Sequence, residues 1–149
     1  MGAGILPVTM SNGILLFLMG KERSNNLWCD FGGSTESGEQ PIQTAIREGG
    51  EELNGILELD NKLYNKVAES MISPVEFNKY TSLFEKSEIK WFTINELKRN
   101  INKFRPHYIP IVNTIIYHES TIKSSVMCYN RMKNLKVIKN KYSTIYRKK

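Results

Sequence analysis

A change in hydrophobic period at residue 41 constrains the fold of this chain more than any other feature. Upstream, Ala3–Val8 and Ile14–Met19 are short apolar runs separated by Asn12-Gly13, a pattern typical of two strands joined by a tight turn. Downstream, residues 41–53 repeat apolar side chains at helical spacing, and the proline at 41 suits a first helical turn. The apolar positions of this predicted helix are Ile42, Ala45, Ile46 and Leu53.

Shorter elements continue the alternation of strands and helices. Trp28–Phe31 and Ile89–Phe92 are predicted as strands, and Tyr108–Tyr117 is predicted as a helix. Thr93, with Glu96 three residues further on, is typical of a helix cap. The pattern over residues 57–86 favours neither helix nor strand. Because strands and helices interleave, we predict an α/β (α+β) fold with a mixed β-sheet.

Length and composition indicate one globular domain. A chain of 149 residues can bury a single core, and 40% hydrophobic with 24% charged residues is typical of globular proteins. No apolar run approaches the roughly 20 residues that cross a bilayer. Residues 1–8 also lack the pattern of a secretory signal, so we expect a cytoplasmic protein with no membrane partner. Cys29 and Cys128 are too few for a disulfide framework and predict reduced thiols.

Charge divides the chain into two parts. Residues 1–120 hold 12 Lys and Arg against 15 Asp and Glu, a net charge of −3, whereas residues 121–149 hold nine Lys and Arg and no acid, a net charge of +9. We therefore predict a folded domain over 1–120 and a basic C-terminal helix or tail over 121–149, packed on the domain or extending from it. Tyrosines among the basic residues are typical of nucleic-acid binding, and a solvated tail is the alternative.

Three glutamates share one side of the predicted helix. Glu48 and Glu52 are four residues apart and Glu51 is three from Glu48, so their carboxylates can converge on one point. Such a cluster suits Mg²⁺ or Mn²⁺, which prefer oxygen ligands, and a solvated acidic surface is the alternative. The loop before the helix favours the metal, because Gly32 and Gly33 let the backbone approach an ion closely.

The spacing of these residues is specific. Gly33 is followed by five residues and Glu39, then by seven residues, Arg47-Glu48, two residues and Glu51-Glu52. This pattern resembles the Nudix box, and residues 28–33 look like the aromatic segment that leads into it. The resemblance implies a Nudix-like α/β/α sandwich. It also implies a divalent-metal-dependent hydrolase of a phosphoanhydride (diphosphate) bond in a nucleoside-diphosphate-linked substrate.

The resemblance further implies roles for individual residues. The metal ligands would be Glu48, Glu51, Glu52 and the carbonyl of Gly33. Either Glu51 or Glu52 would also activate water, and Glu39 with Arg47 would be a supporting pair that orients the helix. Glu88 lies where some relatives carry a further metal ligand or general base. An exposed acid at a strand edge is the alternative for Glu88.

The chain departs from the family pattern in three places. Gly49, followed by Gly50, replaces a bulky apolar residue, and glycines inside a helix cost roughly 1 kcal/mol each relative to alanine. They either loosen the helix or leave room for a neighbouring large side chain. One extra residue precedes Gly55, and the span 55–88 is short for the substrate contacts that many relatives build there.

The basic segment extends the hypothesis to the substrate. Lys123, Arg131 and Lys133 would bind the phosphates of a polyanion. We predict RNA with a 5′ cap or triphosphate as the substrate, with mRNA decapping as the reaction, ahead of a free nucleotide. Diphosphoinositol polyphosphates would also suit the basic surface. Trp28 and Phe31 could stack on a base, although core packing is the favoured role. The alternative function is a catalytically weakened Nudix-like RNA-binding module whose helix is loosened by its glycines.

Overall fold

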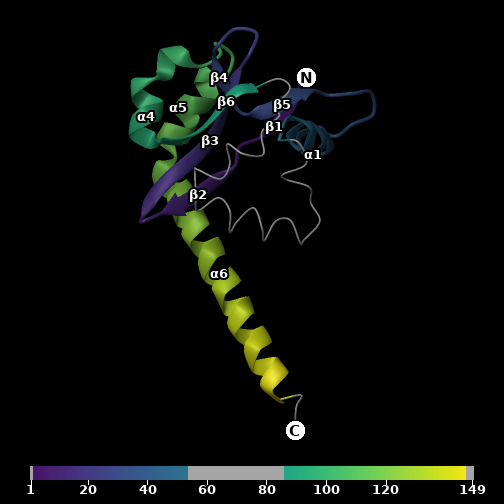
Figure 1. The fold of residues 1–149 in the computed structure, drawn as a ribbon, viewed down its shortest axis with the longest axis vertical. Helices are drawn as coiled ribbons and strands as arrows, with labels where there is room; N and C mark the ends of the chain where they lie inside the picture. The colour runs from purple at the N-terminus through teal and green to yellow at the C-terminus, as the bar shows by residue number, and fades with distance from the viewer. Residues whose placement is uncertain (1, 54–85, 147–149) are drawn as a thin grey trace.

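A computed structural model describes the backbone of residues 2–53 and 86–146, with side chains up to residue 133 (Figure 1). Residues 54–85, which hold most of the span whose sequence pattern is ambiguous and most of the short segment before Glu88, lie outside the described part. The described elements are β1 (Gly2–Ile5), β2 (Val8–Ser11), β3 (Ile14–Glu22), β4 (Trp28–Cys29), β5 (Phe31–Ser34), α1 (Pro41–Glu52), β6 (Lys86–Thr93), α4 (Ile94–Arg99), η1 (Ile101–Lys103), α5 (Ile109–Tyr117) and α6 (Glu119–Tyr146).

Strand β3 organises the sheet. It is joined to β2 by Asn12 and Gly13, whose positive φ angles of 49° and 76° are those that a two-residue hairpin turn needs. β3 pairs antiparallel with β2, β4 and β6, while β1 and β5 form a separate antiparallel pair. In the described ranges, the parallel pairing is an isolated bridge between Trp28 and Phe104. The predicted α+β fold class is confirmed.

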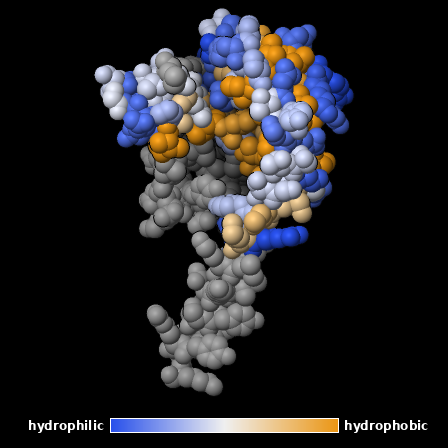
Figure 2. Space-filling view, turned by 180° about the vertical axis from the view of Figure 1, so that it is seen from behind, coloured by the Kyte–Doolittle hydropathy of each residue, from blue (hydrophilic) through white to orange (hydrophobic). Residues whose placement is uncertain are grey.

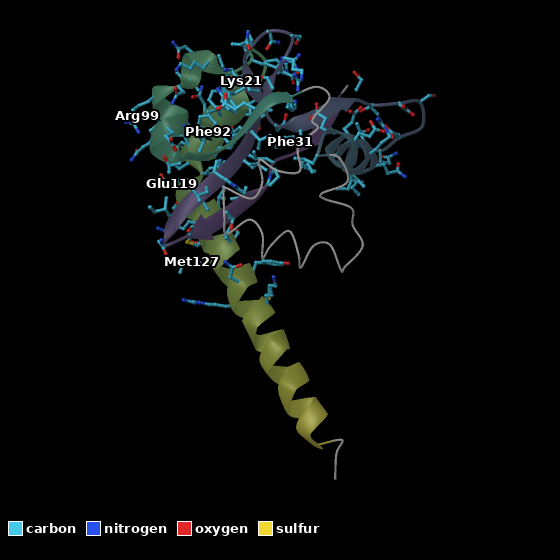
Figure 3. The ribbon with its side chains drawn as sticks, in the orientation of Figure 1. Lys21, Phe31, Phe92, Arg99, Glu119 and Met127 are labelled. Carbon is cyan, nitrogen blue, oxygen red and sulfur yellow. The ribbon has the colours of Figure 1, made fainter. Side chains whose placement is uncertain are left out.

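Alternating side chains along β3 separate two hydrophobic clusters. Phe17 belongs to the large cluster, between the sheet and helices α4 and α5, whereas Leu18 belongs to the small cluster with Phe31 and Leu53 beside α1. In Figure 3, Phe92 of the large cluster lies toward α4 and Phe31 of the small cluster lies toward α1. Helices α4 and α5 therefore pack on one side of β3, and the end of α1, which contacts β1 and β5, packs on the other. The buried members of the large cluster are Leu15, Phe17, Met19, Trp28, Cys29, Phe92, Ile94, Leu97, Phe104, Tyr108, Val112 and Ile115.

Two predicted strands are interrupted in the structure. The segment predicted over Ala3–Val8 divides into β1 and β2 around Leu6 and Pro7, because proline has no N–H to donate to a strand ladder. The carbonyl of Pro7 still accepts a hydrogen bond from Leu18 N at 2.9 Å. The segment predicted over Trp28–Phe31 likewise divides at Asp30, so that β4 joins β3 and β5 joins β1.

The predicted apolar face of α1 is wrong at two positions. Ile42 and Ile46 are 67% and 44% exposed, while Thr44, Ala45 and Gly49 are buried. At Gly49 a Cβ atom would overlap the side chain of Ile5 in β1, and this close approach of the helix to β1 overrides the apolar spacing in the sequence. Other apolar side chains are also exposed on the domain, and Figure 2 shows apolar patches among polar residues on one face.

The C-terminal helices follow the sequence signals more closely. Thr93 caps α4 by accepting a hydrogen bond from Glu96 N at 3.2 Å, and Glu96 Oε2 accepts from Thr93 N at 2.9 Å. Helix α6 begins at Glu119, just before the predicted boundary at residue 120, and extends away from the domain (Figure 1). Its Ile122 and Val126 pack against the large cluster. None of the described helices has both the length and the hydropathy of a membrane span.

Candidate active site

The site is built where β5 leads through a short loop into α1. Gly38, with a φ of +87°, turns the loop, and Pro41 occupies the first turn of the helix. Gln40 and Gln43 form a reciprocal cap, in which Gln40 N donates to Gln43 Oε1 at 2.8 Å. These local signals fix the start of the helix, and they therefore fix which way its acidic residues face.

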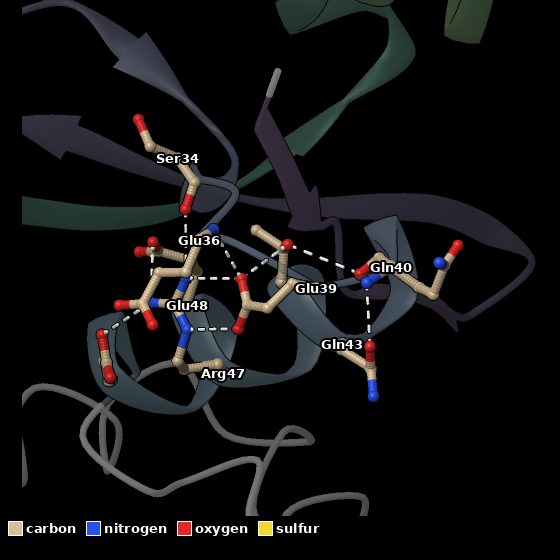
Figure 4. A network of polar contacts seen from close by, with 9 residues as sticks. Ser34, Glu36, Glu39, Gln40, Gln43, Arg47 and Glu48 are labelled. Carbon is tan, nitrogen blue, oxygen red and sulfur yellow. Dashed lines mark hydrogen bonds and ion pairs between the residues drawn. The ribbon is translucent and has the colours of Figure 1, made fainter.

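Arg47 joins the loop to the acidic side of the helix (Figure 4). Its guanidinium donates to both carboxylate oxygens of Glu39, at 2.8 and 3.0 Å, and to the carbonyl of Ser34 at 3.0 Å. It also donates to Glu48 Oε1 at 2.9 Å and lies 3.6 Å from Glu51 Oε2. The bidentate contact with Glu39 fixes the direction of the guanidinium as well as its distance. Arg47 therefore positions Glu48 and Glu51, two of the predicted ligands, relative to the loop.

Glu39 is the anchor of this network. Besides Arg47, its carboxylate accepts hydrogen bonds from Glu36 N and Thr44 Oγ1, both at 2.9 Å. The hydrogen bonds from Arg47 and from the backbone of Glu36 hold the pKa of Glu39 at about 2. Glu39 is therefore ionised at neutral pH. The structure brings together the pair for which the sequence predicted a supporting role.

Gly33 places the backbone of β5 directly against the first predicted ligand. A Cβ atom built at Gly33 would overlap the carboxylate of Glu48, so a side chain at this position would displace the glutamate. The Glu48 side chain is 17% exposed, whereas Glu51 is 64% exposed. The glycine predicted as a metal ligand therefore lies beside Glu48, which is less exposed than Glu51.

Glu52 has a different environment from the other two glutamates. Its side chain is only 7% exposed, and Oε1 lies 3.0 Å from Nζ of Lys86. Burial raises the pKa of Glu52 to about 7, and Lys86 opposes that rise. The second oxygen, Oε2, is buried and has no hydrogen-bond partner. A buried carboxylate oxygen without a partner is uncommon and indicates a place for a ligand.

Lys86 is a site residue that sequence reasoning missed. Its side chain is 1% exposed, and Nζ lies 2.7 Å from Glu22 Oε1 and 3.3 Å from Cys29 Sγ, besides the contact with Glu52. Burial lowers the pKa of Lys86, but the hydrogen bonds and charges of its partners outweigh that effect and keep the pKa above its ordinary value. In the sequence, Lys86 is one charge in a charged run, and no local signal marks it as buried.

The thiol of Cys29 belongs to the buried polar group formed by Glu22, Glu52 and Lys86. It donates a hydrogen bond to Glu22 Oε1 at 3.0 Å. Burial and that hydrogen bond raise the pKa of Cys29 to about 12, so the group stays protonated at neutral pH. Cys29 and Cys128 are both free, as the sequence predicted.

Among the other predicted site residues, Trp28 lies in the large cluster, whereas Phe31 lies in the small cluster beside the end of α1. Glu88 Oε2 lies 3.6 Å from Lys21 Nζ. The strand register places Glu88 on the face of the sheet that carries Phe92. Its predicted part in the metal site stays a prediction. Trp28 and Phe31 are 6% and 0% exposed, so the structure gives both rings the packing role. The predicted substrate contacts on α6 are Lys123, Arg131 and Lys133, of which Arg131 is exposed.

The acidic residues suit a hard cation in kind, although they are not gathered into one cluster. In residues 2–53 and 86–133, no three His, Cys, Asp or Glu side chains lie close enough to hold a metal ion. Glu48 and Glu51 turn toward Arg47, and Glu52 turns toward Lys86. Carboxylate oxygens are nevertheless the ligands that Mg²⁺ and Mn²⁺ prefer, and the unpartnered oxygen of Glu52 fits such a group.

A comparison with known families agrees with the loop, the acidic helix and the fold described above. A family model described as the NUDIX domain matches residues 1–113, well over half of the chain. The chain therefore belongs to the Nudix family. It is accordingly a pyrophosphohydrolase of nucleoside-diphosphate-linked substrates, in a family that generally uses divalent metals such as Mg²⁺ or Mn²⁺. Searches of curated proteins and of solved structures gave no match.

Proposed function

We propose that the protein removes the 5′ cap from RNA by hydrolysing a diphosphate bond at the acidic helix while α6 binds the RNA phosphates. One observation carries the proposal. A domain with the Nudix acidic helix continues into a 28-residue helix that extends from it, and residues 121–149 bear a net charge of +9. Such a charge favours a polyanionic substrate over a small nucleotide, because each cation that meets a phosphate releases a bound counterion.

The proposed metal ligands are Glu48, Glu51, Glu52 and the carbonyl of Gly33. Bound Mg²⁺ or Mn²⁺ would neutralise the charge of the diphosphate and make water a better nucleophile. The chain itself supplies position: Arg47 holds Glu48 against the loop, at 2.9 Å. The helix that carries the ligands runs unbroken from Pro41 to Glu52 through both glycines, and this continuity favours an active enzyme over the weakened binding module.

A proton must leave the attacking water. We assign it to Glu51 ahead of Glu52, because Lys86 holds Oε1 of Glu52 at 3.0 Å and only its buried Oε2 is left to face the cation, whereas Glu51 is 64% exposed and open to water. A general base has to lie within hydrogen-bond reach of the water that it activates, and an exposed carboxylate can meet that need.

The first experiment measures product release from cap-labelled RNA and from a panel of free nucleotides, with Mg²⁺ and with Mn²⁺. We expect metal-dependent release of 7-methylguanosine diphosphate from RNA, and its loss in Glu48→Gln. Glu119→Gln is the matched control, because Glu119 is exposed on α6 away from the acidic helix. Turnover of free nucleotides alone would retain the pyrophosphohydrolase and reject the decapping proposal.

A second experiment tests the role of α6. Arg131→Gln with Lys133→Gln removes two cations from the helix, and Lys98→Gln with Arg99→Gln removes two from α4 as the control. Each lost contact to single-stranded RNA should reduce the slope of log affinity against log salt by about 0.7. We expect this change for the α6 pair and none for the α4 pair. Equal slopes in all three proteins would reject RNA binding by this part of α6.

A further inference from the structure

A buried lysine at the end of α1 holds one oxygen of a proposed metal ligand and leaves the other oxygen without a partner. Lys86 Nζ lies 3.0 Å from Glu52 Oε1, while Glu52 Oε2 is buried with no hydrogen bond. We propose that Lys86 is a positioning residue for the metal centre, which immobilises Glu52 through Oε1 so that Oε2 faces the divalent cation. The inference rests on the proposed function, since it takes Glu52 to be a ligand.

The strand pairing explains why Lys86 lies at this position. β6 is antiparallel to β3 with a register shift between Lys21 and Glu22, and Lys86 is paired with Glu22 just beyond that shift. A bulge of this kind re-aims the side chains on either side of it. Gly20 lies on β3, the strand that carries Glu22. It makes room for the aliphatic part of the lysine side chain, because a Cβ at Gly20 would meet Lys86 Cδ at 2.9 Å. The backbone thus provides both the direction and the space for a buried cation.

Lys86 needs both of its carboxylate partners, Glu22 and Glu52, because it is a buried cation. Glu22 Oε1 lies 2.7 Å from Nζ, and Arg105 Nη1 lies 3.5 Å from the same oxygen. Removing water from an ammonium group is costly unless several opposite charges and hydrogen bonds replace it. Because Glu22 is also bound by Arg105 and Cys29, it stays in place, and Lys86 in turn fixes the rotamer of Glu52.

A purely structural ion pair would leave a different signature at Glu52. Buried polar atoms in folded proteins nearly always have a partner, so a carboxylate that served only to balance Lys86 would be expected to use both oxygens. In Glu52, Oε1 pairs with Lys86, whereas Oε2 is buried at the end of α1 without a hydrogen bond. The asymmetry indicates that the second oxygen is kept for a ligand, and the proposed metal centre supplies one of the right charge.

The test measures Mn²⁺ binding without substrate, by electron paramagnetic resonance of the free ion, in the full-length chain. We expect Lys86→Met to weaken Mn²⁺ binding by about 10- to 100-fold, which is the usual effect of losing a group that orients a ligand. Lys90→Met is the matched control. Lys90 is on the same strand and paired with Glu96 at 3.0 Å, but it lies on the opposite face, so its loss should leave Mn²⁺ binding unchanged.

A background substitution separates positioning from general damage. In a Glu52→Gln chain, Lys86→Met should cause no further loss of Mn²⁺ affinity, because the residue through which Lys86 acts is already neutral. A further loss would indicate a structural effect and overturn the proposal. If Lys86→Met alone does not fold, Lys86→Gln is compared instead and should weaken binding in the same direction.

The outcomes also distinguish this inference from the proposed function. If the unmodified chain binds no Mn²⁺, or if Glu48→Gln leaves binding unchanged, the metal centre and the role of Lys86 are both overturned. If Glu48→Gln weakens binding while folded Lys86→Met binds as tightly as the unmodified chain, the metal centre stands and only the role of Lys86 is rejected.

Discussion

The two faces of the sheet are held by different kinds of contact. Among the described residues, the large cluster beneath α4 and α5 has twelve buried members, including the aromatic series Trp28, Phe92, Phe104 and Tyr108. The small cluster beside α1 has three. Among the described residues, α1 is held by the ion pairs of Arg47 and Glu52 and by the close contact of Gly49 with the side chain of Ile5.

The difference shows how the molecule separates stability from geometry. Burial of apolar area has no preferred direction, so the large cluster can stabilise the domain without specifying the position of any one atom. Hydrogen bonds and ion pairs are directional, and a site needs its groups held within a fraction of an ångström. Within the described ranges, the functional residues accordingly lie on the side with the small apolar cluster and the polar network.

The largest expected effect is the loss of an aromatic ring from the large cluster. Phe92 is 2% exposed and makes edge-to-face contacts with Trp28 and Phe104, with ring centroids 4.9 Å and 5.7 Å apart. Phe92→Ala should lower the free energy of unfolding by about 3–5 kcal/mol, from lost burial and the cavity left behind. Urea unfolding measures the change. A cost below about 1 kcal/mol would mean that the large cluster is not the main source of stability.

The next effect concerns the contact that seats α1. A side chain at Gly49 would overlap Ile5 of β1, so Gly49→Leu, which introduces a bulky apolar residue, should cost about 1–3 kcal/mol through overpacking. Ile5→Ala in the same chain should restore part of the loss, because it vacates the space. Thermal unfolding of the two single variants and the double variant measures the coupling. Strict additivity would show that the two residues do not share this space.

A smaller effect of opposite sign is expected at the neighbouring glycine. Gly50 has open space around the position of a Cβ, so Gly50→Ala should raise the free energy of unfolding by up to about 1 kcal/mol through helix propensity alone. Gly38→Ala is the contrasting control. Gly38 also has open space but has a φ of +87°, so alanine there should destabilise the loop. A stabilised Gly38→Ala would contradict the assigned backbone geometry.

The smallest expected effect is a pH dependence of the stability that the ion pair of Glu39 and Arg47 contributes. The pKa of Glu39 is lowered from its ordinary value of 4.5 to about 2, chiefly by Arg47. A lowered carboxyl pKa gives stabilisation that is fully present above 4.5 and is lost as the pH falls through about 2. The difference in unfolding free energy between the unmodified chain and Glu39→Gln should therefore shrink over that interval. A difference that does not vary with pH would show that the ion pair contributes nothing.

Local signals in the sequence were sufficient for local structure. The Asn12-Gly13 turn, the Thr93 cap and the helix after Pro41 each depend on residues a few positions apart. The predicted pair of Glu39 and Arg47 is similarly close in the chain, and the structure joins the two directly. The metal-binding and catalytic roles of the glutamates stay predictions.

Long-range packing could not be predicted in this way. Lys86 meets Glu22 across 64 residues, and only the register of β6 against β3 brings the two together. The outward position of Ile42 and Ile46 follows from the close approach of Gly49 to Ile5, which no spacing along the helix encodes. A sequence pattern gives the faces of an element, but the neighbouring element decides which face is buried.

The contact between Ile5 and Gly49 has an evolutionary consequence. Because the two positions share one volume, a homologue with a large residue after the Arg-Glu pair of the helix should carry a smaller residue at the position of Ile5, and the two should covary. A lineage that moves from one arrangement to the other passes either through two large residues, which collide, or through two small ones, which leave a gap. Closely packed cores tolerate a gap or a clash only at a cost, so the first substitution conditions the second. We therefore expect the glycine at position 49 and the large residue at position 5 of the first strand to depend on each other.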